Sequence, residues 1–185
     1  MRKLIFAFLF LINQSFAQSN HGYFREVDST GLIVILTTTD TLSSINNKCA
    51  VKGIILSKDS QNLFVLNYMF KTPVSVNLND TYKLKIKFKN GDVLELPYMA
   101  REENYNEGDF IEFFVEVTRE ILQKMKKKKA VSISLFKDEC IKTIDVEEES
   151  LKILGKLSEF MLTVDIYKER ELTWTELSQF RFPEN

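Results

Sequence analysis

Short runs of apolar residues recur at close intervals along the chain and predict β-strands. Residues 23–27 form a first candidate, and residues 32–36 are apolar at all five positions, which is typical of a strand covered on both faces. Residues 50–57 and 63–70 predict two more strands, joined by a polar five-residue loop at 58–62. Strands spaced so closely indicate antiparallel pairing.

The clearest alternation lies in residues 81–98, where apolar residues alternate with lysines before an Asn90-Gly91 turn. A two-residue loop would direct the apolar side of the second strand into water. A three-residue loop at 89–91 keeps both apolar sides on one face and places Gly91 in the left-handed position. The predicted pairs are Ile86 with Leu94, Leu84 with Leu96, and Tyr82 with Tyr98.

The second half of the chain mixes strands with helices. Residues 110–117 predict a strand, and Thr118 is a candidate N-cap for a short helix that follows it. Further elements are expected in this order: strands at 131–135 and 140–146, a helix of about 15 residues at 147–162, and a last short helix at 173–180, after a capping box that begins at Thr173.

These elements predict a mainly β (α+β) fold. We expect an antiparallel β-sandwich or barrel-like sheet of about eight or nine strands, with two or three short helices. The longest helix is expected near 147–162. A single domain over residues 18–185 with a C-terminal helical segment is the simplest organisation, and a split near Thr163 is the alternative.

The N-terminus has the pattern of a secretory signal peptide. Met1-Arg2-Lys3 is a short positive region, residues 4–12 are continuously apolar, and Ser15 and Ala17 are the small residues expected before a signal peptidase cut. A nine-residue helix spans about 14 Å, well short of a ~30 Å hydrocarbon core. We therefore predict that residues 1–17 are removed and that the protein is periplasmic or secreted, without a transmembrane segment.

The composition disfavours several kinds of partner, cofactor site and catalytic site. The chain has 25 Lys and Arg against 26 Asp and Glu, so no global field draws it to nucleic acid, and no nucleic acid partner is expected. One His and two Cys are too few for the common zinc, haem and iron–sulfur sites, and no cofactor is expected. His21 stands close to the predicted mature terminus, which disfavours a His-dependent catalytic triad.

Cys49 and Cys140 are the only cysteines, so a single intramolecular pairing is possible. In an oxidising compartment two thiols of one domain often form a disulfide. The alternative is that each is separately buried as a small hydrophobic residue. Both interpretations stay open at the level of sequence.

The strongest charge run is made by five lysines: Lys124, Lys126, Lys127, Lys128 and Lys129. They could form a patch for an anionic ligand, such as a lipid headgroup or a polysaccharide. They could also be a solvated helix end, since cations at a helix C-terminus oppose the helix dipole.

The segment 101–109 concentrates oxygen ligands of the kind that calcium prefers. The candidates are Glu102, Glu103, Asn104, Asn106, Glu107 and Asp109. Their spacing lacks the alternating order of an EF-hand loop, so an ordinary polar loop is the alternative.

The chain contains no H-E-x-x-H or C-x-x-C motif, no Gly-rich phosphate loop and no dinucleotide-binding fingerprint. The expected function is therefore that of an exported, non-enzymatic β-rich domain, which acts in binding or structural association in the bacterial cell envelope. Its partner could be another envelope protein or a polysaccharide. The alternatives are a secreted effector or inhibitor of another protein, and a carboxylate-dependent hydrolase of an extracellular polymer.

Overall fold

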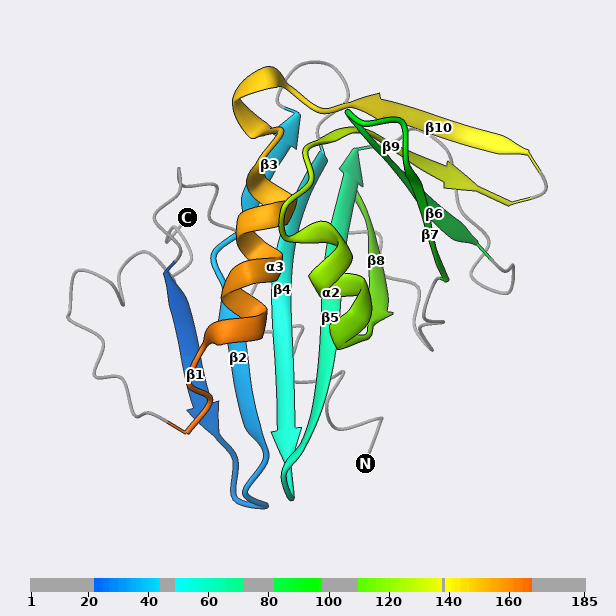
Figure 1. The fold of residues 1–185 in the computed structure, drawn as a ribbon. Helices are drawn as coiled ribbons and strands as arrows, with labels where there is room; N and C mark the ends of the chain where they lie inside the picture. The colour runs from blue at the N-terminus through cyan, green and yellow to red at the C-terminus, as the bar shows by residue number, and fades with distance from the viewer. Residues whose placement is uncertain (1–21, 44–48, 72–81, 98–109, 138, 168–185) are drawn as a thin grey trace, which may run out of the picture.

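The computed structural model describes residues 22–43, 49–71, 82–97, 110–137 and 139–167. Within these ranges the chain is mainly β, with two antiparallel sheets and two α-helices (Figure 1). The predicted antiparallel β-rich fold is confirmed. The barrel alternative is wrong, because neither sheet closes on itself, and the described ranges hold ten strands, not eight or nine.

The larger sheet has six strands. Five of them follow one another in space in the order β1 (Tyr23–Val27), β2 (Ile33–Thr37), β4 (Cys49–Lys58), β5 (Gln61–Lys71) and β8 (Phe110–Val117). The sixth, β3 (Asp40–Ser43), pairs with β4. As expected from its continuous apolar run, β2 is buried at every position.

The strand β3 was not predicted, because Asp40–Ser43 contains one apolar residue and shows no alternation of apolar and polar residues. Together, β2 and β3 pair with successive parts of β4, with a break between Thr37 and Asp40. At the break the backbone N–H of Gly53 donates to the Thr37 hydroxyl at 2.8 Å. A side chain thus replaces the missing ladder bond, which keeps this buried N–H satisfied.

The turn between β4 and β5 is tighter than predicted. Lys58 pairs with Gln61, so the loop contains only Asp59 and Ser60, and the five-residue loop expected at 58–62 is wrong. Both residues have positive φ, 51° and 64°, as a two-residue hairpin of the right twist requires. Neither is glycine, so the long β4–β5 ladder overrides a local preference against this conformation.

The smaller sheet has four strands, in the order β10 (Cys140–Asp145), β9 (Ala130–Phe136), β6 (Lys83–Phe88) and β7 (Val93–Pro97). The predicted hairpin register is confirmed, since Ile86 pairs with Leu94 and Leu84 with Leu96. The N–H of Phe88 donates to the carbonyl of Asp92 at 2.9 Å, and Gly91 has φ +90°. The predicted partner Tyr98 lies outside the described residues.

The first described helix is α2 (Arg119–Met125), and its predicted N-cap is confirmed because the Thr118 hydroxyl accepts from the Ile121 N–H at 3.3 Å. The longer helix α3 (Ile153–Thr163) begins later than the predicted residue 147, after a short 3-10 turn, η1 (Glu148–Ser150). The cause is a tertiary contact between this turn and the larger sheet. The Ser150 hydroxyl donates to the Thr41 carbonyl of β3 at 2.9 Å, which holds this turn against the sheet. The helix expected at 173–180 lies outside the described residues.

Both helices lie against one face of the larger sheet (Figure 1). Gly53 of β4 makes this approach close: a Cβ there would stand 2.9 Å from Met161 Sδ and 3.0 Å from Leu157 Cδ1, both on α3. The main core joins residues of both sheets and both helices into one cluster. No helix in the described ranges has the length and apolar character needed to span a membrane.

Candidate functional site

The predicted lysine run lies at the end of α2 and in the connection that leads from it to β9. Lys124 is in the last turn of the helix, Lys126 is its C-cap, and Lys127, Lys128 and Lys129 follow. The run therefore lies at a helix end, and whether it also binds an anionic ligand stays a prediction. The structure adds that other lysines join this run from distant parts of the chain.

Three segments meet at this point. The N–H of Lys89, in the β6–β7 turn, donates to the Lys129 carbonyl at 2.9 Å, and the N–H of Ala130 donates to the Leu151 carbonyl at 3.1 Å. On α3, Gly155 lies against the Lys126 carbonyl, which would be 3.0 Å from an added Cβ. We call the resulting group the lysine surface. Its members are Lys89, Lys124, Lys126, Lys127, Lys128, Lys129, Lys152 and Lys156.

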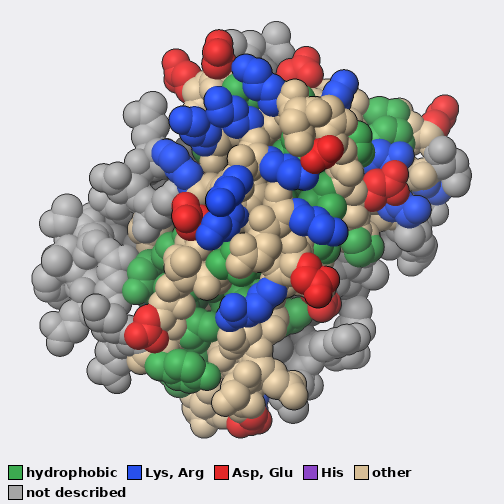
Figure 2. All heavy atoms as spheres, in the orientation of Figure 1, with side chains coloured by type: hydrophobic (Ala, Val, Ile, Leu, Met, Phe, Trp, Pro, Cys, Tyr) green, Lys and Arg blue, Asp and Glu red, His purple; other side chains and the backbone are tan. Residues whose placement is uncertain are grey.

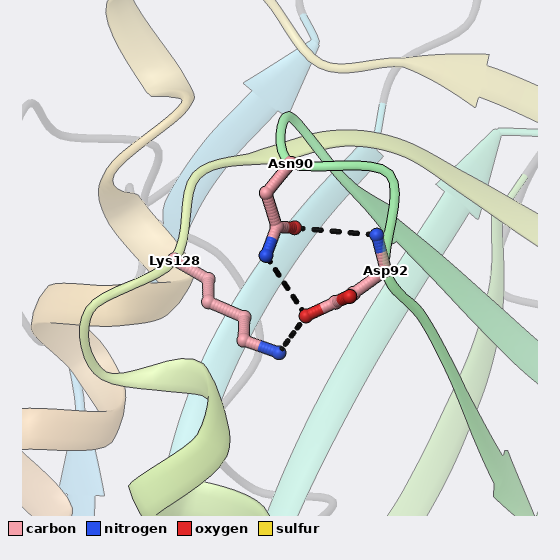
Figure 3. A network of polar contacts seen from close by, with 3 residues as sticks. All are labelled: Asn90, Asp92 and Lys128. Carbon is pink, nitrogen blue, oxygen red and sulfur yellow. Dashed lines mark hydrogen bonds and ion pairs between the residues drawn. The ribbon is translucent and has the colours of Figure 1, made fainter.

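Lys128 is held in place by the turn between β6 and β7 (Figure 3). Its Nζ donates to Asp92 Oδ2 at 2.6 Å, and the Asn90 amide donates to the same oxygen at 2.8 Å. The hydrogen bond from Lys128, followed by that from Asn90, lowers the pKa of Asp92. Lys128 Nζ also lies 5.1 Å from the ring centroid of Phe88, within cation–π range. Lys128 thus links the β6–β7 turn to the connection between α2 and β9.

Lys126 is the second paired member of the lysine surface. Its Nζ lies 3.8 Å from Glu159 Oε1 on α3. No ion pair joins the other six lysines to another described residue. Their charges therefore face solvent without a fixed counterion in the described part of the protein, which leaves them free to bind an external anion.

Figure 2 shows Lys and Arg side chains gathered on the face that carries α2 and α3, with acidic side chains between and around them. The exposed large hydrophobic residues in the described ranges are Val27, Val93 and Tyr167. None of them belongs to α2, α3 or the α2–β9 connection. The helices and the connection therefore present no large exposed hydrophobic residue among those described, whereas Val93 follows Asp92 at the end of the β6–β7 turn.

The two cysteines are free thiols in the structure, Cys49 buried and Cys140 exposed, so the predicted disulfide is not formed there. The Cys140 sulfur lies 3.3 Å from the Thr143 hydroxyl on the same strand. Burial raises the pKa of the Cys49 thiol and that of the Tyr68 hydroxyl near it, so both are neutral at physiological pH. Cys49 thus packs as a small core residue, and the pairing itself remains a prediction.

All six candidate calcium ligands lie outside the described ranges: Glu102, Glu103, Asn104, Asn106, Glu107 and Asp109. Among the residues that the structure does describe, no group of three or more His, Cys, Asp or Glu side chains could hold a metal ion. The calcium hypothesis therefore remains a prediction from sequence.

Three members of the lysine surface were not predicted from the sequence: Lys89, Lys152 and Lys156. Lys89 reaches it because β6 pairs with β9, a contact between strands that are not neighbours in sequence. Lys152 and Lys156 reach it because α3 packs against the end of α2. Their position four residues apart on a predicted helix was a usable signal for one shared face.

Comparisons with protein-family models, curated proteins and solved structures gave no match to the chain.

Proposed function

We propose that the chain is an exported, non-enzymatic β-rich domain that acts by binding in the bacterial cell envelope. The lysine surface is the face that binds, and an anionic polysaccharide is its ligand. The observation that carries this proposal is the meeting of eight lysines from three separate segments, of which only Lys126 and Lys128 have described ion-pair partners. The leader-like residues 1–17 support the envelope as the place of action.

Local charge supports binding of a polyanion although the whole chain has a formal net charge of −1. Solvent ions screen charges beyond about 8–10 Å, so a ligand at the surface responds to the nearest side chains and not to the net charge. An extended polymer with repeated carboxylate or phosphate groups can contact several of the lysines at once. Each contact adds a modest amount, and several together give useful affinity.

A polysaccharide is favoured over a lipid bilayer for a structural reason. Proteins that bind reversibly to membranes usually combine basic residues with apolar side chains that enter the headgroup region. The described exposed large hydrophobic residues lie outside the helices and the connection that carry most of the lysine surface. These helices and the connection thus present charge without a large exposed hydrophobic residue, which suits a hydrated polymer.

The test measures binding of the chain from Gln18 onward to polygalacturonate, by calorimetry at low and high salt. We expect the variant Lys127→Glu/Lys156→Glu to lose about tenfold or more in affinity, because two charge reversals remove contacts and add repulsion. The matched control is Lys58→Glu/Lys83→Glu, which changes net charge equally on β4 and β6. We expect the control to bind like the parent protein.

Three results would contradict the proposal. The first is an equal loss of affinity in both variants, which would mean that net charge and not the lysine surface governs binding. The second is no measurable binding of the parent protein at low salt. The third is binding to phosphatidylglycerol vesicles with none to polygalacturonate, which would assign the surface to a membrane.

A further inference from the structure

The two described ion pairs of the lysine surface differ in how closely the carboxylate is held. Lys126 Nζ lies 3.8 Å from Glu159 Oε1, which is too far for a hydrogen bond. Lys128 Nζ lies 2.6 Å from Asp92 Oδ2, and Asn90 Nδ2 donates to the same oxygen at 2.8 Å (Figure 3). One cationic and one neutral donor thus converge on the Asp92 carboxylate, as they do on a bound anion.

We propose that Lys128 and Asn90 form a subsite for a carboxylate group of the polysaccharide, and that Asp92 occupies this subsite in the free protein. This inference rests on the proposed function and names the ligand group and one place where it binds. The N–H of Lys89 donates to the Lys129 carbonyl at 2.9 Å, so the β6–β7 turn and the α2–β9 connection lie side by side here. A polymer that crosses from the turn to the connection therefore passes the subsite.

The backbone of Asp92 is held in place while its side chain is accessible. The N–H of Phe88 donates to the Asp92 carbonyl at 2.9 Å, and the N–H of Asp92 donates to Asn90 Oδ1 at 3.2 Å. These two contacts hold the turn without the carboxylate. The Asp92 side chain is 52% exposed, so rotation about its χ1 moves the carboxylate into water without moving the turn.

Lys128 keeps a second contact when Asp92 leaves. Its Nζ lies 5.1 Å from the centroid of the Phe88 ring, which attracts the cation independently of the carboxylate. A solvent-exposed ion pair contributes little net stability, since each ion exchanges its partner for water. A polymer carboxylate that other lysines already hold close therefore replaces Asp92 readily.

The variant Asp92→Asn tests this subsite, because the amide keeps the shape of the side chain and removes the competing charge. We expect its affinity for polygalacturonate, measured by calorimetry at about 0.15 M salt, to exceed that of the parent about two- to fivefold. The matched control is Glu95→Gln, which removes the same charge from a pair with Lys85 at 2.9 Å outside the lysine surface. The Glu95 side chain is 51% exposed, and we expect this control to bind like the parent.

A second comparison separates displacement from general repulsion between Asp92 and the polymer. In a Lys128→Met background the subsite has no cation to release, so adding Asp92→Asn should leave the affinity nearly unchanged. An equal gain with and without Lys128 would mean repulsion alone and would overturn the inference. A parent protein that binds, with an Asp92→Asn variant of native circular dichroism and unchanged affinity, would overturn the inference and leave the proposed function standing. If neither protein binds, both fail.

Discussion

Gly155 of α3 lies directly against the backbone carbonyl of Lys126, so close that an added Cβ would stand 3.0 Å from that oxygen. The Lys128 carbonyl would be 3.2 Å away from the same Cβ. Because backbone atoms cannot rotate aside as a side chain can, this contact sets the distance between α3 and the end of α2. The connection after α2, which carries four members of the lysine surface, is thus held against α3 by a contact that only glycine allows.

Gly155→Ala should therefore destabilise the protein by about 1–3 kcal/mol, through overpacking against a fixed backbone. In a helix without this contact, the same change would stabilise by roughly 0.5–1 kcal/mol. Gly53→Ala is the comparison, because its nearest neighbours are the side-chain ends of Met161 and Leu157. We expect a smaller loss there, measured by urea denaturation. A stabilising Gly155→Ala would show that the helices are farther apart than described.

The ion pair of Asp92 and Lys128 predicts a pH dependence. The pKa of Asp92 is held below its ordinary value of 3.8, mainly by the hydrogen bond from Lys128. A carboxyl with a lowered pKa stabilises the fold above its unfolded-state pKa, and this effect is lost as pH falls through the folded-state pKa. An NMR titration of the Asp92 carboxyl carbon should give a midpoint below 3.8 that rises in Lys128→Met. Lys124→Met, which removes an exposed lysine of α2, should leave it unchanged.

The β6–β7 hairpin predicts unequal costs for neighbouring faces. Leu84 is fully buried between Leu96 and Leu135, so Leu84→Ala should cost about 2–5 kcal/mol in unfolding free energy. Lys87 is exposed on the other face of the same strand, and Lys87→Ala should stay within about 0.5 kcal/mol. Thermal or urea unfolding of both variants measures the two losses in unfolding free energy. Similar losses would mean that the hairpin faces are assigned the wrong way round.

Thiol chemistry distinguishes the two interpretations of the cysteines. With Cys140 exposed and Cys49 buried at raised pKa, Ellman's reagent should react quickly with one thiol per native chain. A second thiol should react only after unfolding without reductant, and Cys140→Ser should abolish the fast reaction. If no thiol reacts even in the unfolded, unreduced protein, the two cysteines form the disulfide that the sequence suggested.

Local patterns predicted the local parts of this fold. Alternation and the Asn90-Gly91 turn were enough to place Leu84 opposite Leu96, because hairpin register depends on loop length and on a shared apolar face. The N-cap Thr118 was equally local. By contrast, β3 has no pattern of its own and depends on β4, and the start of α3 depends on the contact of Ser150 with Thr41.

The members of the lysine surface likewise divide into those that a local pattern predicted and those that only tertiary contacts bring in. The lysines at 124–129 were visible as a run, since they are neighbours in sequence. Lys89 and Lys156 join them only through the pairing of β6 with β9 and the packing of α3. Contacts between segments far apart in sequence leave little trace in the composition of either segment. The segment 101–109, which lies outside the described residues, shows the converse: its local pattern is clear, and calcium binding to it stays a prediction.

The close fit of α3 over Gly53 has a consequence for biosynthesis. The strands β4 and β5 form early in the order of synthesis, whereas Leu157 and Met161, which fill the space above Gly53, emerge near the end of the chain. A partly synthesised chain therefore carries a sheet whose apolar face has no partner, and it cannot complete its native packing. Such a chain stays loosely folded until nearly all of it has been made. Under the export that we propose, this delay keeps the chain in the unfolded form that passage through a translocation channel requires.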